Sequence, residues 1–515
     1  MQDKEAMFRP ANVRSTRGRG LATVIASALS LGIASGPGCS SEAEVRASGP
    51  PEIPLVLLIS IDCARADHFS CYGYDIETTP AVDLLAQDGI RFERCYSQCN
   101  WTKPSVASLF TGQHVRGHGV TVGSQALNAI GEFERVDKSL GAYPLPSDIP
   151  LLAESMRARG YRTVGVVENT HISAVQGFGR GFDQYTVAKP ALPTTLVQFE
   201  GVVNATAPQA LYSYVHFIGP HDPYDNDLSP HKDKGNAKAF ARYRARLATF
   251  DSQIDFTRFD YKKQKALSEQ DLRQARALYD TELAYFDGEY VGPLLDWLRE
   301  EGLYDEALIV LTADHGEELG EHGSWAHGHA LHESLIHIPL IIKLPASVDG
   351  LPAGSAVSEL VESIDLFPTL CEFVGAPVPR ECHGESLRSL LLGKREVDPN
   401  AIAVSEHAKG SSKQVLAATV IQGNEKYLTR YEGETIRPLV LNVEGDKALF
   451  DLSTDAMERK DLKEQDPDRV REMLKLLEGR VGSSPRLFRQ QGEMILLDAE
   501  EVDDLRSLGY IGEEE

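Results

Sequence analysis

Residues 55–62 read LVLLISID, a continuous apolar run that ends in the carboxylate of Asp62. Such a run predicts a strand that is buried on both faces of a sheet. Four further apolar runs follow along the chain, at residues 163–167, 210–217, 308–311 and 338–342. Helical patterns separate the runs, and this alternation predicts an α/β fold with a mostly parallel central sheet covered by helices on both sides.

Asp62 and Asp314 both stand where an apolar run ends. Ligands of open α/β sheets collect at the carboxyl ends of the strands, so we expect the two side chains to lie close together. A buried carboxylate is costly unless something pairs with it, and a cation is one solution. Asp62 also has a second interpretation, as the N-cap of a following helix.

Imidazoles are concentrated after the strand at 308–311. Asp314 and His315 are both good ligands for a divalent metal, and Gly316 permits a turn beside them. Three further histidines follow at His322, His327 and His329. A lone histidine is usually structural, but this density beside a strand end indicates a site.

Two other segments carry groups that suit ester chemistry. His221 follows the run at 210–217 in a proline-rich turn, where it could bind a tetrahedral anion, protonate a leaving group or simply form the turn. Thr102, two residues before Pro104, marks a helix start, which Thr102 or Lys103 would cap. A helix N-terminus also holds anions, and a metal beside the hydroxyl would make it a nucleophile.

Taken in order, these motifs resemble those of the sulfatases and their relatives in the alkaline phosphatase superfamily. The pattern is a strand ending in Asp62, followed by WTKPSVASLFTG at 101–112, HFIGPHDPY at 216–224 and DHGE at 314–317. Weaker likenesses extend the resemblance to about residues 52–511, at IDLFPTL (364–370), LFDL (449–452) and LRSLGY (505–510).

The resemblance implies an alkaline-phosphatase-like α/β/α sandwich with an ester site at one edge of the sheet and a smaller C-terminal α+β subdomain. By position, one divalent metal ion would be held by Asp62, Thr102, Asp314 and His315. Thr102 would be the nucleophile. The transferred group or its leaving oxygen would be contacted by His221 and by one of His327 or His329.

The sequence departs from the sulfatase pattern at three positions. Thr102 stands where sulfatases carry the Cys or Ser that is oxidised to formylglycine, so we expect no formylglycine here. Val106 occupies the usual arginine position, and Cys63 replaces the second Asp of the usual pair. The loss of a hard oxygen ligand weakens a calcium site, and the softer histidine ligation favours manganese or zinc over calcium, with magnesium also left open. A Thr-based site resembles the phosphotransferase branch that includes the lipoteichoic acid synthases.

These features predict a metal-dependent hydrolase of sulfate or phosphate esters, with Thr102 as nucleophile on a single divalent ion. The substrate would be a sulfated or phosphorylated small molecule, glycan or lipid head group. Two alternatives remain open: a phosphotransferase acting on a phosphodiester, and a catalytically degenerate binder of sulfated or phosphorylated glycans. A purely structural surface lipoprotein would leave the histidines unexplained.

Charge and the N-terminal segment indicate where the protein acts. The net charge of −24 argues against nucleic-acid binding, which needs a basic surface. Residues 1–39 have a basic start and a short apolar run, as in a signal peptide, and Cys39 suggests the lipoprotein type. A polar linker follows at 40–51. We therefore expect an exported protein, periplasmic or at the surface of a bacterium, anchored to the membrane by lipid.

The rest of the chain is expected to form two parts. A catalytic domain at 52–395 would carry a lysine- and arginine-rich insertion at 225–278, either a solvated helical hairpin or a lid over an anionic substrate. A C-terminal subdomain at 396–515 would contain a helix that begins at Asp466 and Pro467. Export permits disulfides, with candidate pairs Cys371–Cys382 and Cys71 with Cys95 or Cys99.

Overall fold

The computed structural model describes residues 49–121, 141–188, 201, 209–221, 268–408, 415–431, 446–483, 487, 495–499 and 501–503. The expected signal segment with Cys39, most of the linker, most of the 225–278 insertion and the acidic tail lie outside these residues. Among the helices that are described, none combines the length and the apolar character needed to cross a bilayer.

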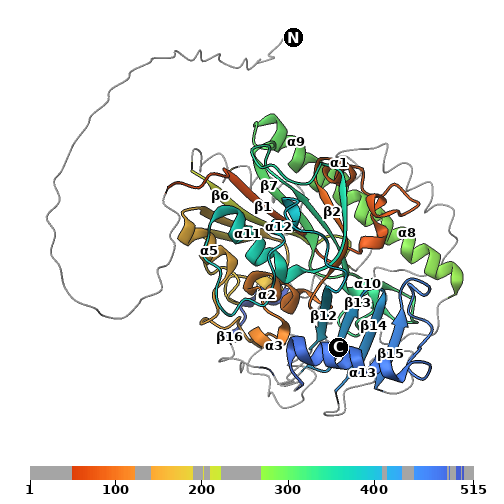
Figure 1. Ribbon diagram of the computed structural model, residues 1–515. Coiled ribbons are helices and arrows are strands. Elements are labelled where there is room, and N and C mark those ends of the chain that lie inside the picture. Colours follow the sequence, from red (N-terminus) through yellow and green to blue (C-terminus); the bar gives the residue numbers. More distant parts are fainter. Residues whose placement is uncertain are drawn as a thin grey trace, which may run out of the picture. The chain divides into compact units, whose positions relative to one another are not determined.

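The central sheet has eight strands in the order β11-β2-β10-β7-β1-β6-β4-β5 (Figure 1). Their bounds are β1 (Leu55–Ile61), β2 (Ile90–Tyr96), β4 (Arg162–Val167), β5 (Gln184–Val187), β6 (Leu211–Phe217), β7 (Ala307–Ala313), β10 (His337–Lys343) and β11 (Ser355–Glu362). Strand β10 runs antiparallel to both β7 and β2, and the other pairings in this sheet are parallel. The predicted α/β fold with a mostly parallel sheet is therefore confirmed.

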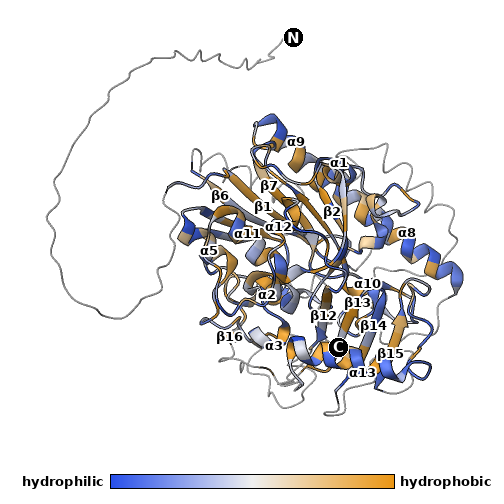
Figure 2. Ribbon diagram, viewed as in Figure 1, coloured by the Kyte–Doolittle hydropathy of each residue, from blue (hydrophilic) through white to orange (hydrophobic). Residues whose placement is uncertain are grey.

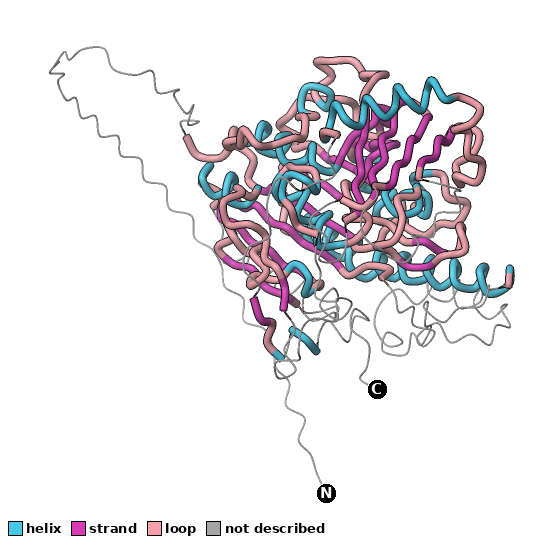
Figure 3. Tube along the Cα trace, turned by 90° about the horizontal axis from the view of Figure 1, so that it is seen from below, coloured by secondary structure: helices cyan, strands magenta, loops and turns pink. Residues whose placement is uncertain are grey.

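The middle of the sheet explains the continuous apolar runs. Every residue of β1, β6 and β7 is buried, and the central strands in Figure 2 are mainly hydrophobic. Helices flank the sheet on both sides, as Figure 3 shows. Both faces are therefore buried, and apolar residues follow one another along these strands without alternating with polar ones. The main hydrophobic cluster is formed by these strands and by the helices that cover them.

Two groups of helices cover the sheet. One contains α2 (Thr102–Thr111), α5 (Leu152–Arg159) and α11 (Leu366–Val374), which pack on one another. The other contains α1 (Pro80–Asp88), α8 (Glu269–Phe286) and α9 (Gly292–Glu300), joined through the π-helical turn Asp287–Val291. The short elements are α3 (Val115–His118), α10 (Glu333–Ile336), α12 (Arg388–Leu391) and the strand pairs β8 (Glu318–Leu319) with β9 (Trp325–Ala326) and β3 (Gly141–Ala142) with β16 (Ile495–Leu496).

A second, antiparallel sheet follows in the C-terminal part. Its strands are β12 (Ile402–His407), β13 (Ala417–Gln422), β14 (Glu425–Arg430) and β15 (Lys447–Asp451), in that order. Helix α13 (Pro467–Val481) packs on β13 and β14 through Met473 and Leu477. The predicted helix start is confirmed, because the Asp466 side chain accepts a hydrogen bond from the Arg469 amide.

No disulfide joins the six cysteines among the described residues, so the pairs considered from the sequence do not form. Cys371 is buried in α11 against the main core, with Ser155 beside its thiol. The Sγ atom of Cys382 lies 3.6 Å from the carbonyl oxygen of Gly112.

Candidate active site

Three neighbouring strands end at the same level. Ile61 of β1 lies beside Ala313 of β7 and beside Phe217 of β6. The residues that follow, Asp62, Asp314 and the turn at 218–221, therefore emerge together at the carboxyl edge, as the sequence predicts. Gly219 in this turn has φ +58°, and a Cβ there would lie 2.5 Å from the Asp62 carbonyl oxygen, so only glycine lets the turn pass so closely.

The two carboxylates are buried and incompletely paired. Oδ2 of Asp62 accepts a hydrogen bond of 2.7 Å from Nδ2 of Asn169. Oδ1 of Asp62 and Oδ2 of Asp314 accept no hydrogen bond from the described residues. Two buried carboxylate oxygens without donors are a costly arrangement that a cation would relieve.

Nearby imidazoles shape the electrostatics of this pair. Nε2 of His216 lies 3.5 Å from Oδ2 of Asp314 and 4.0 Å from Oδ2 of Asp62. Burial, and then the neighbouring Asp314, raise the pKa of Asp62. The pKa of Asp314 is lowered, because His315 and His216 outweigh the opposing effect of burial. The environment thus keeps negative charge on Asp314, where a metal ligand needs it.

His315 directs its Nε2 at the carboxylates. Its Nδ1 lies 2.8 Å from the carbonyl oxygen of Gly316, which can only accept, so Nδ1 carries the proton. Nε2 then faces Oδ1 of Asp62 at 3.4 Å and Oδ2 of Asp314 at 3.7 Å. A ring whose other nitrogen donates to a carbonyl is the usual arrangement of a metal-binding histidine.

Thr102 points its hydroxyl into the same space. Oγ1 lies 3.3 Å from Nε2 of His315, 3.4 Å from Nδ2 of Asn169 and 3.5 Å from Oδ2 of Asp62. The N-cap of α2 is Trp101, so Thr102 is the first helical residue and neither it nor Lys103 caps the helix. The N-cap interpretation of Asp62 is also wrong, because Arg65 holds that position in the next helical turn.

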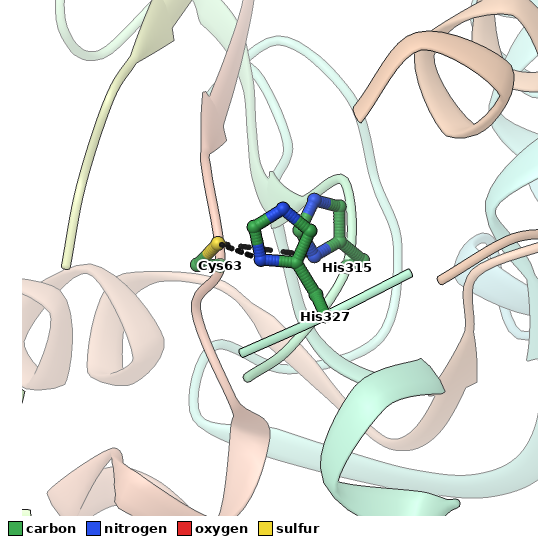
Figure 4. Close-up of side chains that lie close together, drawn as sticks. All are labelled: Cys63, His315 and His327. Carbon is green, nitrogen blue, oxygen red and sulfur yellow. Dashed lines mark hydrogen bonds between the residues drawn. The ribbon is translucent and has the colours of Figure 1, made fainter. Parts of the chain in front are cut away.

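Cys63 and His327 lie beside His315, as Figure 4 shows, and His315 links this group to the carboxylates. Sγ of Cys63 lies 3.5 Å from Nδ1 of His327 and 3.9 Å from Nδ1 of His315. The His327 ring centroid is 4.6 Å from that of His315 and 4.9 Å from that of His221. Cys63 and Ala326 both have left-handed backbones, with φ of 58° and 62°, a strained conformation that is typical of functional sites.

The structure separates the two histidines that the sequence could not distinguish. His327 joins the site, and its Nδ1 also lies 3.2 Å from Oε1 of Glu317. His329 points elsewhere, because its Nε2 contacts Oε2 of Glu318 at 2.5 Å and Oγ of Ser324 at 2.9 Å.

Sequence reasoning missed several neighbours of the site. Asn169 follows the buried strand β4. A polar residue just after a buried strand was the pattern used for Asp62 and Asp314, and it would have identified Asn169 as well. His216 lies within the buried strand β6, and a polar residue inside an apolar run was the sequence signal for a functional role. Lys103 is buried beside Thr102, and its Nζ donates to Oε1 of Gln176 at 2.6 Å and to the carbonyl of Tyr143 at 2.9 Å. Burial lowers the pKa of Lys103 to about 7.

The side chains fit a divalent cation. Their possible ligand atoms fall into overlapping sets of three, each within 4.8 Å: Asp62, His216 and Asp314; Asp62, Cys63 and His221; Cys63, His315 and His327. The carboxylates, imidazoles and thiol suit zinc or manganese better than calcium, which prefers oxygen ligands throughout.

The fold and the site together define a member of the alkaline phosphatase superfamily. Residues 54–376, more than half of the chain, match the family described as Sulfatase, and residues 320–481 match N-sulphoglucosamine sulphohydrolase, C-terminal. The chain belongs to the sulfatase family.

Individual relatives are distant. Arylsulfatase K of Xenopus laevis is 30% identical over 236 residues, which are 44% of this chain and 41% of that protein. N-acetylglucosamine-6-O-sulfatase of Bacteroides thetaiotaomicron is 23% identical over 419 residues, 66% of this chain and 71% of the relative. The crystal structure of a phosphonate monoester hydrolase of Agrobacterium radiobacter shares the fold, with a TM-score of 0.60, 21% identity and coverage of 83% of this chain and 95% of that one.

Proposed function

We propose that this chain hydrolyses a sulfate or phosphate ester with Thr102 as the nucleophile. The observation that carries the proposal is the position of Oγ1 of Thr102, buried at a helix N-terminus within 3.5 Å of His315, Asn169 and Asp62. A hydroxyl that only stabilised the helix would not need three polar neighbours from three other segments. The sulfate- and phosphonate-ester relatives support the same class of reaction.

Four residues would hold the metal: Asp62, Asp314, His315 and Thr102. Bound there, a divalent cation would lower the pKa of the Thr102 hydroxyl and withdraw charge from the ester oxygens. The ion would bind the oxygens of Asp62 and Asp314 that accept no hydrogen bond from the described residues, and Nε2 of His315. His216 and Cys63 lie close enough to complete the coordination.

In the first half-reaction, the Thr102 hydroxyl gives its proton to solvent water, Oγ1 forms a bond to phosphorus or sulfur, and the bond to the leaving oxygen breaks. Asn169 orients the nucleophile, because its Nδ2 lies within reach of Oγ1 and of Asp62. The free amides at the start of α2 stabilise the non-bridging oxygens. A proton passes to the leaving oxygen from His221 or His327, the more exposed members of the site.

In the second half-reaction, water attacks the threonyl ester and releases inorganic phosphate or sulfate. A threonyl phosphate can be cleaved in this way, whereas a formylglycine hydrate releases sulfate by collapsing to the aldehyde, a route that Thr102 lacks. This difference favours a phosphate ester over a sulfate ester. One relative is named N-acetylglucosamine-6-O-sulfatase, which also makes a sugar ester a candidate substrate.

The test is a paired assay of the full chain with aryl sulfate, aryl phosphate and phosphodiester substrates, each with Mn²⁺, Zn²⁺, Ca²⁺ and Mg²⁺. We expect turnover of a phosphate substrate with Mn²⁺ or Zn²⁺. The absence of turnover with every pair, together with binding of a sulfated or phosphorylated glycan, would favour the binding protein instead.

We further propose export with lipidation at Cys39, on the basis of the N-terminal sequence alone. Expression in a Gram-negative bacterium tests it, since the intact mass of the membrane-fraction protein should show an acylated Cys39 as first residue. Cys39→Ala should then release the protein from the membrane fraction. Recovery of unmodified wild-type protein in the soluble periplasm would contradict the lipid anchor.

A further inference from the structure

A carboxylate outside the candidate active site collects three imidazoles. Oε1 of Glu318 lies 2.5 Å from Nδ1 of His322 and 3.2 Å from Nδ1 of His332, while Oε2 contacts His329. The His322 and His332 ring centroids are only 3.5 Å apart. Glu318, His322 and His332 are all buried. None of these side chains takes part in the chemistry assigned to Thr102.

The hydrogen bonds of this cluster require a cationic His322 unless a metal ion takes the place of one proton. Nε2 of His322 lies 2.8 Å from the carbonyl oxygen of Met457, which can only accept, so Nε2 carries a proton. Nδ1 of His322 then either carries a second proton, which makes the ring cationic, or directs a lone pair at a cation shared with Glu318. The carbonyl contact is the one that orients metal-binding histidines elsewhere.

We propose that Glu318, His322 and His332 form a second metal site, and that it binds zinc. Two imidazoles and one carboxylate are a common protein ligand set for this ion. Their ligand atoms lie within 4.8 Å of one another. Metal–ligand distances of about 2.0–2.1 Å would require Glu318 to withdraw from His322 by roughly 0.8 Å.

The site would hold in place the segment that carries His327. Glu318 lies in β8, which pairs with β9, and His327 follows β9 directly. His332 lies at the start of α10. A metal bound to both ends of the segment would fix the loop between them, including the left-handed Ala326 that turns His327 toward Cys63. It is therefore a structural metal, separate from the reacting one.

Metal content tests the proposal. The full chain is dialysed against Zn²⁺ at micromolar concentration, washed, and its zinc per chain measured by plasma mass spectrometry. The variant His322→Gln/His332→Gln should retain one zinc ion fewer than wild type. The matched control is His337→Gln, a partly exposed histidine whose Nε2 contacts the Glu93 carbonyl, and it should retain the wild-type content. Equal zinc in wild type and the double variant would overturn the proposal.

A second measurement covers the case in which the double variant does not fold. Asp62→Asn/Asp314→Asn removes ligands of the candidate active site and leaves the Glu318 cluster intact. X-ray absorption of this variant should show zinc with imidazole scattering and N or O neighbours at about 2.0–2.1 Å, and no sulfur at about 2.3 Å, which zinc held by Cys63, His315 and His327 would show. A zinc-free variant, zinc without imidazole scattering, or zinc with a sulfur neighbour would show that the cluster is a hydrogen-bonded network around a protonated His322.

Discussion

Nε2 of His315 lies 3.3 Å from Oγ1 of Thr102, while Nδ1 of the same ring is oriented by the Gly316 carbonyl oxygen. Both atoms lie beside the buried oxygens of Asp62 and Asp314, and these are the four side chains that would bind the proposed cation.

Removal of the Thr102 hydroxyl should abolish turnover. We expect Thr102→Ala to lower kcat/KM by at least about 10³-fold, since loss of a nucleophile removes the covalent route. Thr102→Ser keeps the hydroxyl and should retain most of the activity. Thr111→Ala, in the same helix, loses a hydroxyl that donates to the Ala107 carbonyl and accepts from the Gln113 amide, and it serves as the control. Equal activity of Thr102→Ala and the control would show that Thr102 is not the nucleophile and only begins the helix.

Neutralising a carboxylate should weaken metal binding. Asp314→Asn keeps the shape of the side chain but removes its charge. Loss of a residue that only supports a metal ligand typically weakens metal binding about 10- to 100-fold, so we expect loss of a ligand to raise the metal Kd by at least this factor. Competition with a fluorescent chelator measures it. Asp296→Asn, at an exposed carboxylate, should leave the Kd unchanged. An unchanged Kd in Asp314→Asn would mean that the cation binds elsewhere.

The two histidines of the segment should differ in kinetic effect. His327→Ala should lower kcat by about 10²- to 10⁴-fold, because a general acid or a contact to the transferred group is lost. His329→Ala removes a contact to Glu318 outside the site and should leave kcat close to wild type. Steady-state kinetics of the two variants decide the assignment, and the opposite ranking would exchange their roles.

Cys63 should tune the choice of metal. Cys63→Asp restores a hard oxygen ligand and should raise activity with Ca²⁺ or Mg²⁺ relative to Zn²⁺. Cys63→Ser, which is small and uncharged, should lower activity with zinc without favouring calcium. If the ratio of activities with Ca²⁺ and Zn²⁺ is the same in all three proteins, the thiol lies outside the coordination sphere.

Acid stability should depend on His118. Its Nδ1 accepts a hydrogen bond from the Val120 amide at 3.0 Å and its Nε2 contacts Oγ of Ser108 at 2.9 Å, a pattern that fits the neutral ring. Burial, and then His383, lower the pKa of His118 from 6.5 to about 3. The unfolded chain therefore binds a proton that the folded chain resists, and this stability is present above pH 6.5 and is lost as pH falls toward 3.

His118→Asn keeps an acceptor for the Val120 amide but cannot titrate. Urea unfolding at several pH values between 3 and 7 should give a flatter dependence of the free energy of unfolding on pH in this variant than in wild type, even though the variant is less stable at pH 7. Parallel curves for the two proteins would show that His118 does not titrate in the folded protein.

Much of the fold was predictable because apolar runs such as 55–61 and 308–311 report burial on both faces. The reversal of β10 was not, since a buried strand has the same composition in either direction. Strand β2 was missed because Arg91, Glu93 and Arg94 interrupt its apolar residues, so it contains no continuous apolar run.

The site was predictable where a motif placed a side chain at a strand end, as for Asp62 and Asp314. The site was not predictable where only tertiary packing decides which way a side chain points. His327 and His329 are two residues apart, and the left-handed Ala326 is what sends one of them to the site. Asn169 follows a strand that carries no recognised motif, and His216 opens the HFIGPHDPY motif, in which only His221 was given a role.

The central claim is that Thr102 forms a covalent bond to the transferred group. Wild-type protein quenched with acid during turnover of its best substrate should carry a phosphoryl or sulfuryl group on the proteolytic peptide that contains Thr102, as detected by tandem mass spectrometry. The account predicts this adduct in wild type and its absence in Thr102→Ala. Sustained turnover by Thr102→Ala, or an adduct on another residue of the wild-type protein, would contradict it.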